Sequence, residues 1–224
     1  MATRDRFSRK QLKRPDEFIS TSERVIDFCQ KNQGVLIASA LVVVLVIGGA
    51  SFVSHNRKQQ ELRMENLLDE MQGVKENAAG KGPVTDQLKE YLDRFDEGMH
   101  KQRARLLLAN AFYQEQKFPE AIAVYNEILR QSRPGETVYE LAQVDLGYAY
   151  ESEKDYKKAI EIYKSIVDRG EALSLFDVYL SLARTYELVQ DSKNALLILR
   201  EMENKFKDHA QLFKVRGKIK KLEG

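Results

Sequence analysis

The clearest hydrophobic pattern in the chain is an apolar run from Gly34 to Val53. These twenty residues include no charged side chain, and Ser39 and Ser51 are their only hydroxyl-bearing members. A helix of twenty residues is about 30 Å long, which matches the hydrocarbon core of a bilayer. A core helix of a soluble protein would have a polar stripe, so the pattern predicts a transmembrane helix over residues 34–53.

Such a segment is either a cleaved export signal or a permanent anchor. Gly48 and Ala50 are small enough to precede a cleavage site. However, 33 residues precede the run, and the run is longer than the roughly 7–15 apolar residues of a signal peptide. We therefore favour an uncleaved anchor, while the two small residues leave cleavage open as the alternative.

The polar residues before the run are predicted to include a short helix. Ser20 and Glu23 have the spacing of a capping box, in which the serine caps the helix start. Val25, Ile26 and Cys29 then share one helical face. The tail thus reads as a short cytoplasmic helix that leads into the membrane.

Lysine and arginine counts decide the expected orientation of the anchor. Within twenty residues of each end of the run the count is three against three, so the nearby charges give no preference. The full tail, residues 1–33, has eight basic residues and predicts a cytoplasmic N-terminus with the larger domain on the other side. The eight are Arg4, Arg6, Arg9, Lys10, Lys13, Arg14, Arg24 and Lys31.

Apolar residues after the run recur at three- and four-residue steps, which is the period of an amphipathic helix. Two such stretches lie in residues 54–100, separated by the chain-breaking sequence Gly80–Pro83. We predict a helical hairpin beside the membrane. Its apolar positions are Met64, Leu67, Leu68, Met71 and Val74, then Leu88, Tyr91, Leu92 and Phe95.

Residues 101–209 contain three copies of one pattern. Each copy has a leucine followed by a small residue, an aromatic residue four positions after the leucine, and an alanine thirteen positions after it. The leucines are Leu108, Leu146 and Leu182, and the alanines are Ala121, Ala159 and Ala195. The alanines are 38 and 36 residues apart, a period typical of helical repeats.

This pattern resembles the tetratricopeptide repeat, a helix–turn–helix unit of about 34 residues. The resemblance implies that the small residue after each leucine lets the two helices of a repeat approach closely. Pro119 suits the first turn of a second helix, and Asp155 and Asp191 suit the caps of the next two. The third copy departs from the pattern at Ser192 and Leu199, where aromatic residues are expected.

The predicted fold is therefore all-α. A single N-terminal transmembrane helix precedes a right-handed helical solenoid of tetratricopeptide-like repeats. The last segment, 210–224, is predicted to be a basic capping helix with Leu212, Val215, Ile219 and Leu222 turned inward.

Composition gives no support for catalysis. The net charge of +2 gives no reason to expect nucleic acid as a partner. His55, His100 and His209 are far apart and lack ligand partners at metal-binding spacing. No phosphate-binding loop or nucleophile motif is present in the sequence. We predict a non-enzyme with no catalytic residues, no metal, no cofactor and no small-molecule substrate.

The resemblance to tetratricopeptide repeats implies a concave groove lined by the first helix of each repeat. Its mixture of aromatic, aliphatic and charged residues suits weak binding of peptide segments. A clamp for acidic C-termini is disfavoured, because Leu106 and Asp177 occupy two clamp positions and only Asn110 matches. The predicted partner-binding residues are Arg103, Asn110, Tyr113, Val144, Tyr148, Glu151, Leu180, Arg184 and Glu187.

The order of basic tail, anchor, hairpin and repeats resembles the YfgM-like family of bacterial inner-membrane proteins, which are ancillary subunits of the SecYEG translocon. The resemblance covers the whole chain in architecture, and at the level of motifs only the repeats. It implies a periplasmic helper chaperone that binds exported chains beside the translocon and works with a membrane-anchored prolyl-isomerase-like chaperone. Two alternatives stay open: an assembly scaffold for an envelope or division complex, and an import receptor whose repeats face the cytosol.

Overall fold

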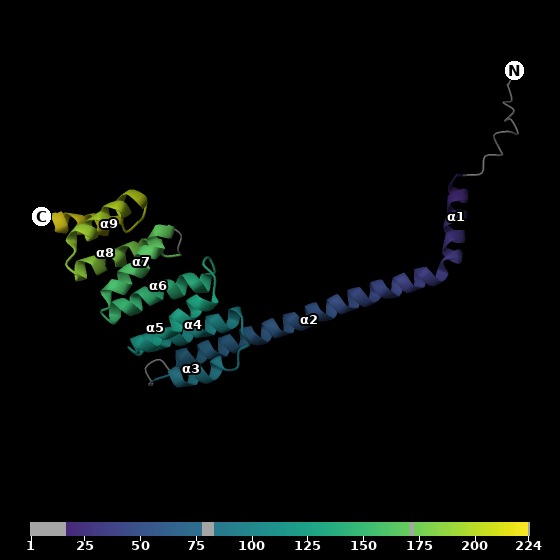
Figure 1. Cartoon of the computed structure of the whole chain (residues 1–224), viewed down its shortest axis with the longest axis horizontal. Coiled ribbons are helices and arrows are strands. Elements are labelled where there is room, and N and C mark those ends of the chain that lie inside the picture. Colours follow the sequence, from purple (N-terminus) through teal and green to yellow (C-terminus); the bar gives the residue numbers. More distant parts are fainter. Residues whose placement is uncertain (1–16, 78–82, 171–172, 224) are drawn as a thin grey trace, which may run out of the picture. The chain divides into compact units, whose positions relative to one another are not determined.

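The computed structural model describes residues 17–77, 83–170 and 173–223, and its described regular elements are ten helices, α1 to α10 (Figure 1). The chain divides into two compact units, Met1–Glu61 and Leu62–Gly224. We describe each unit by itself. The all-helical content agrees with the fold class predicted from the sequence.

The first unit contains α1 (Glu17–Lys31) and the first part of α2 (Gln33–Asn77). The apolar run lies within α2, and its side chains are exposed; Leu45, for example, is 73% exposed. Among the described helices, α2 alone is long and apolar enough to cross a membrane. An N-terminal signal sequence has the same features, so length and composition make α2 a candidate span.

The predicted helix start at Ser20 is wrong. Helix α1 begins at Glu17, so Ser20 lies inside the helix and does not occupy the cap position. No proline or glycine interrupts the sequence between Glu17 and the apolar face, so nothing in it stops a helix from starting before Ser20.

The second unit begins with the end of α2, which packs with α3 (Thr85–Leu92). Leu68 and Met71 of α2 and Leu88 of α3 belong to one buried cluster. The predicted break at Gly80–Pro83 lies outside the described residues except for Pro83. The carboxylate of Glu115, which follows α4, accepts hydrogen bonds from the Val84 and Thr85 amides at 2.7 and 3.2 Å and so fixes the start of α3.

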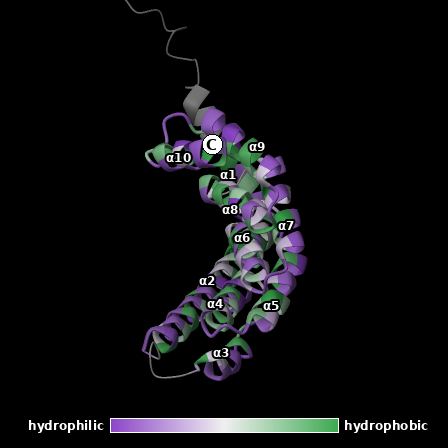
Figure 2. Cartoon of the chain, turned by 90° about the vertical axis from the view of Figure 1, so that its left-hand side faces the viewer, coloured by the Kyte–Doolittle hydropathy of each residue, from purple (hydrophilic) through white to green (hydrophobic). Residues whose placement is uncertain are grey.

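Three helix pairs follow, and they correspond to the three copies of the sequence pattern. The pairs are α4 (Met99–Gln114) with α5 (Phe118–Gln131), α6 (Thr137–Ser152) with α7 (Tyr156–Arg169), and α8 (Leu175–Leu188) with α9 (Ser192–Lys205). Within this unit the first helices α4, α6 and α8 lie on the inner side of a curved stack, and α5, α7 and α9 lie on the outer side (Figure 2).

The repeat pattern places its members at the interfaces between helices. All three leucines and all three alanines are buried. The closest approach is at Gly147, where an added Cβ would lie 2.9 Å from Tyr163 Cδ1. A glycine is needed there because any side chain would overlap the buried ring of the following helix.

The turn inside each repeat has the same backbone geometry. Gln116, Lys154 and Gln190 all have a positive φ of 60–65°, the left-handed conformation that ends many helices. Asp155 and Asp191 then cap the next helix, accepting from Lys158 N at 3.3 Å and from Asn194 N at 3.1 Å. Pro119 lies in the first turn of α5. The capping residues predicted in the repeats are thus confirmed.

The third repeat is packed as fully as the others, although it lacks the two aromatic residues. Leu199 is completely buried, and the aliphatic side chains of α10 (Leu212–Glu223) complete its core. Leu212, Val215 and Ile219 are buried, as predicted, and Leu222 packs against them. The last helix therefore covers the apolar face of the final repeat, as solenoids require.

Candidate functional site

The predicted groove residues all lie on the inner helices of the second unit. Helix α4 has Arg103, Asn110 and Tyr113; helix α6 has Val144, Tyr148 and Glu151; and helix α8 has Leu180, Arg184 and Glu187. The structure divides them between an open section beside α2, α4 and α6 and a closed section beside α6, α8 and α10.

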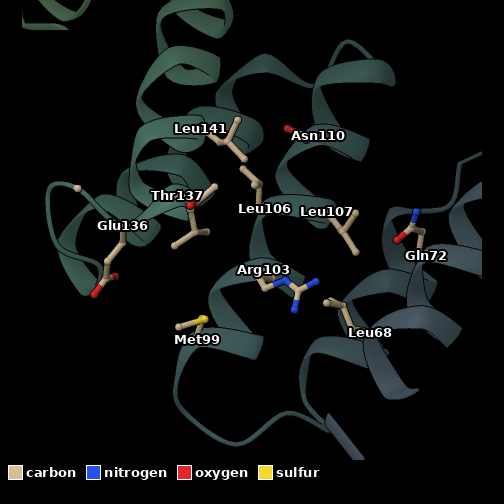
Figure 3. Close-up of a pocket in the computed structure, with 12 residues that line it drawn as sticks. Leu68, Gln72, Met99, Arg103, Leu106, Leu107, Asn110, Glu136, Thr137 and Leu141 are labelled. Atoms are coloured by element: carbon tan, nitrogen blue, oxygen red, sulfur yellow. The ribbon is translucent and has the colours of Figure 1, made fainter. Parts of the chain in front are cut away.

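The open section begins with an apolar pocket of about 610 Å³ between α2, α4 and the start of α6 (Figure 3). Arg103 lines this pocket, and its guanidinium donates to Glu65 at 2.8 Å. This hydrogen bond holds the pKa of Glu65 below its usual range. The apolar lining consists of Leu68, Met99, Leu106, Leu107, Val138 and Leu141.

A second, smaller pocket of about 160 Å³ adjoins the first, and Asn110 lines both. Three predicted residues meet here: Asn110, Tyr113 and Tyr148. The Tyr125 hydroxyl donates to Asn110 Oδ1 at 2.5 Å, which orients the amide. The other lining residues are Lys75, Gln114, Tyr125 and Asp145.

The carboxyl group of Asp145 has a strongly shifted pKa. Burial raises the pKa of its carboxyl from 3.8 to about 6, and the positive charge of Lys75 offsets only part of that effect. Burial also lowers the pKa of Lys75. The ion pairs found between described residues include neither of these two groups. Each charge has therefore lost part of its hydration without forming an ion pair, which costs free energy of folding.

The closed section has its charges paired. Arg184 donates to both oxygens of Glu151 at 2.8 and 2.9 Å, and Tyr163 donates to the same carboxylate at 3.2 Å. Glu187 accepts from Lys218 of α10 at 2.7 Å. Two further predicted residues, Val144 and Leu180, are half-buried and pack against the core.

Sequence reasoning missed part of the open section. Leu141 occupies the position in the second repeat that Arg103 occupies in the first, 38 residues earlier, so the repeat period could have identified it. Asp145 follows the predicted Val144 directly. The wall formed by Leu68 and Lys75 has no repeat signature, because α2 takes the place of an inner helix without matching the pattern.

The described residues offer no cluster of three histidine, cysteine or carboxylate side chains that could hold a metal ion. His100 lies 3.2 Å from Glu65, and the ring of His209 stacks on Phe176 with centroids 3.5 Å apart. Both histidines thus have structural contacts. The arrangement is that of a binding surface with an apolar pocket and a polar pocket side by side.

Comparisons with known proteins agree with this fold. Nearly identical TPR-like repeats from Podosopora anserina, attributed to a kinesin light chain, are 16% identical to this chain, with a TM-score of 0.58, and the match covers 71% of this chain and 85% of that one. A single-substitution variant of that protein has the same identity and TM-score, with 84% of it covered. At this identity the likeness concerns the fold alone. No curated protein sequence matches the chain.

The chain also matches a family model. The model of the family described as "Tetratricopeptide repeat-like domain" matches residues 27–174, which is more than half of the chain. Repeat domains of this kind typically act as non-catalytic adaptors between proteins, and no enzyme family is indicated. This chain belongs to the tetratricopeptide repeat-like domain family.

Proposed function

We propose that this protein is a single-pass membrane adaptor that binds protein partners on the periplasmic side of the bacterial inner membrane, near the Sec translocon. The observation that carries the proposal is the apolar pocket between α2, α4 and α6, in a chain that also has one apolar helix of membrane-spanning length. An exposed apolar concavity of this size is typical of a surface that buries a partner's side chain.

An anchor would give such a weak binding surface a clear advantage. A groove that binds peptides loosely gains occupancy when it is held where its partners appear, because tethering raises their effective concentration. Residues 34–53 would supply the tether. On this account the repeat domain receives or hands over newly exported chains beside the translocon.

The orientation and the location rest on the sequence. The eight lysine and arginine residues of the tail favour a cytoplasmic N-terminus. The resemblance to the YfgM-like family supports the translocon and a membrane-anchored prolyl-isomerase-like chaperone as neighbours. Neither argument depends on the geometry of the repeats.

The topology can be tested with an internal control, because Cys29 is the only cysteine. A membrane-impermeant maleimide is added to intact bacteria that produce either the native chain or a variant with Cys29→Ser and Glu153→Cys. We expect labelling of the cysteine at the exposed position 153 and protection of Cys29 until the cells are lysed. Labelling of Cys29 with protection at position 153 would instead place the repeats in the cytosol, as in an import receptor.

The partner class can be tested by placing a photo-crosslinking amino acid at Tyr148, inside the polar pocket. The translocon account predicts crosslinks to many exported chains, and co-purification of translocon subunits from mild detergent. The scaffold alternative predicts a single crosslinked partner that is folded. A single folded partner with no translocon subunit would overturn our proposal in favour of an envelope or division complex.

A further inference from the structure

The two pockets share the lining residue Asn110, and we call the pair of them the channel. Three helices, α2, α4 and α6, line both pockets. On each helix, the residues that line the apolar section begin earlier in the sequence than those that line the polar section. In the apolar section the helices contribute Leu68, Leu106 and Leu141, and in the polar section they contribute Lys75, Tyr113 and Asp145. The shared residue Asn110 marks where the two sections meet.

The polar section has the side chains of a pocket that binds a positively charged group. Asp145 lines it with its carboxylate side chain, and three aromatic residues, Tyr113, Tyr125 and Tyr148, line the same pocket. Carboxylates and aromatic faces both attract guanidinium and ammonium groups. The volume of about 160 Å³ exceeds the ~30 Å³ that a water molecule occupies in the liquid, so such a group can enter.

Lys75 does not fill this role for Asp145. Its charge acts on the carboxyl, yet the two groups are not among the ion pairs within 4.0 Å in the described part of the chain. Lys75 is half-buried, and the long flexible stem of a lysine lets its ammonium group move away from the carboxylate when a second cation enters. The short Asp145 side chain is held in place by α6. An arriving cation would therefore replace Lys75 as the nearest positive charge.

We propose that the channel binds an extended segment of a partner protein in which an apolar side chain is followed, a few residues along, by an arginine or a lysine. Leu106 and Tyr113 are seven residues apart on α4, about 10 Å at ~1.5 Å per residue. An extended peptide covers that distance in about three residues. The apolar side chain enters the larger pocket, and the basic group reaches Asp145. This inference rests on the proposed binding function and names the chemistry of the partner segment.

The test uses the full-length chain in detergent micelles and two fluorescein-labelled dodecapeptides. The peptides share a Gly/Ser background and differ only in the unit Leu-Ser-Ser-Arg or Leu-Ser-Ser-Glu. We expect fluorescence anisotropy to give a dissociation constant about tenfold lower for the arginine peptide. A third peptide, with Ser-Ser-Ser-Arg, should bind more weakly than the first because it leaves the apolar pocket empty.

The matched variants are Asp145→Asn and Asp177→Asn. Asp177 is an exposed carboxylate on α8, outside the channel, so its replacement should keep the tenfold preference, whereas Asp145→Asn should reduce it to less than about threefold. Circular dichroism of each variant checks that it is folded. The comparison of peptides on the native chain needs no variant, so a poorly folded Asp145→Asn chain does not weaken the test.

The inference is overturned if the native chain binds the arginine and glutamate peptides equally, or binds neither up to millimolar concentration. It is also overturned if folded Asp145→Asn keeps the full preference. If the peptides bind equally while Tyr148 still crosslinks exported chains, the inference fails and the proposed function stands. If the arginine preference is found without such crosslinks, the inference stands and the proposed function fails.

Discussion

Two sections of the same inner surface differ in how they hold their charges. Beside α2, α4 and α6, Asp145 is half-buried, and no ion pair within the described residues includes it. Beside α6, α8 and α10, Glu151 and Glu187 are each joined to a basic side chain, Arg184 and Lys218. The two sections share α6, and each also includes one helix outside the three repeats, α2 or α10.

The unpaired charge makes the open section the better binding surface. Where charges are already paired, a partner must break an ion pair before it can form its own, and little is gained. Where a half-buried charge has no ion-pair partner, the free protein has already lost part of the hydration energy, and an arriving opposite charge offsets that loss. The open section is therefore less stable by itself and better suited to binding.

The largest expected effect comes from removing the unpaired charge. The pKa of Asp145 is about 6 in the folded chain against 3.8 ordinarily, a gap worth about 3 kcal/mol. Because this pKa is raised, the charge destabilises the fold above about pH 6, and the effect disappears below about pH 4. The charged and titratable groups around it are Lys75, Tyr113, Tyr125 and Tyr148.

Asp145→Asn should accordingly increase the free energy of unfolding by up to about 3 kcal/mol at pH 8 and leave it nearly unchanged at pH 3.5. Urea unfolding followed by circular dichroism at both pH values measures the difference. Asp177→Asn, at an exposed site, is the control and should change the free energy by less than about 0.5 kcal/mol. A destabilised Asp145→Asn chain at pH 8 would mean that the carboxylate has a stabilising partner.

The next effect concerns α6, which borders both sections. Gly147→Ala places a methyl group against the buried Tyr163 ring, and overpacking of this kind costs about 1–3 kcal/mol. We expect a net loss of about 2 kcal/mol in thermal or urea unfolding. Gly217→Ala in α10, where nothing lies within 4 Å of the added Cβ, should instead stabilise by up to about 1 kcal/mol. Equal effects of the two substitutions would contradict the tight contact.

A smaller effect is expected from opening the closed section. Arg184→Ala leaves the Glu151 carboxylate, whose side chain is 14% exposed, with the Tyr163 hydroxyl as its remaining donor among the described residues. We expect a loss of about 1 kcal/mol. A double-mutant cycle with Glu151→Gln should give a coupling free energy of similar size. Additive effects of the two substitutions would show that the pair does not stabilise this section.

The smallest effect is expected at the second ion pair. Lys218→Ala removes the 2.7 Å contact with Glu187, but both side chains are about one-third exposed. Such a pair contributes about 0.5 kcal/mol and is weakened by salt. The loss should vanish when unfolding is measured in 1 M sodium chloride. A larger loss that persists at high salt would indicate that Lys218 stabilises α10 by packing and not by charge.

The repeats could be predicted from the sequence because their signals are local and recur. The leucine, the small residue and the alanine stand at fixed positions, and Asp155 and Asp191 cap helices within three residues of themselves. The start of α1 was mispredicted because Ser20 and Glu23 match a capping box inside a longer helix. A short motif of this kind does not reveal that helical residues precede it.

The open section could not be predicted in full, because its residues come together only in the fold. Lys75 and Asp145 are 70 residues apart in the sequence and line one pocket. Tyr113 and Glu151 were both predicted to line the groove, because they occupy equivalent positions in consecutive repeats. In the structure Tyr113 lines a pocket, whereas Glu151 forms an ion pair with Arg184. Which charges find partners depends on the neighbouring repeat and not on the repeat itself.

The central claim is that partners bind the open section and not the closed one. Leu141 and Asp177 occupy the same position in consecutive repeats, both are exposed, and only Leu141 lines the channel. A photo-crosslinking amino acid at each position, in the full-length chain in living cells, compares the two sections directly. The account predicts partner adducts from position 141 and almost none from position 177. Equal yields, or a higher yield from position 177, would contradict it.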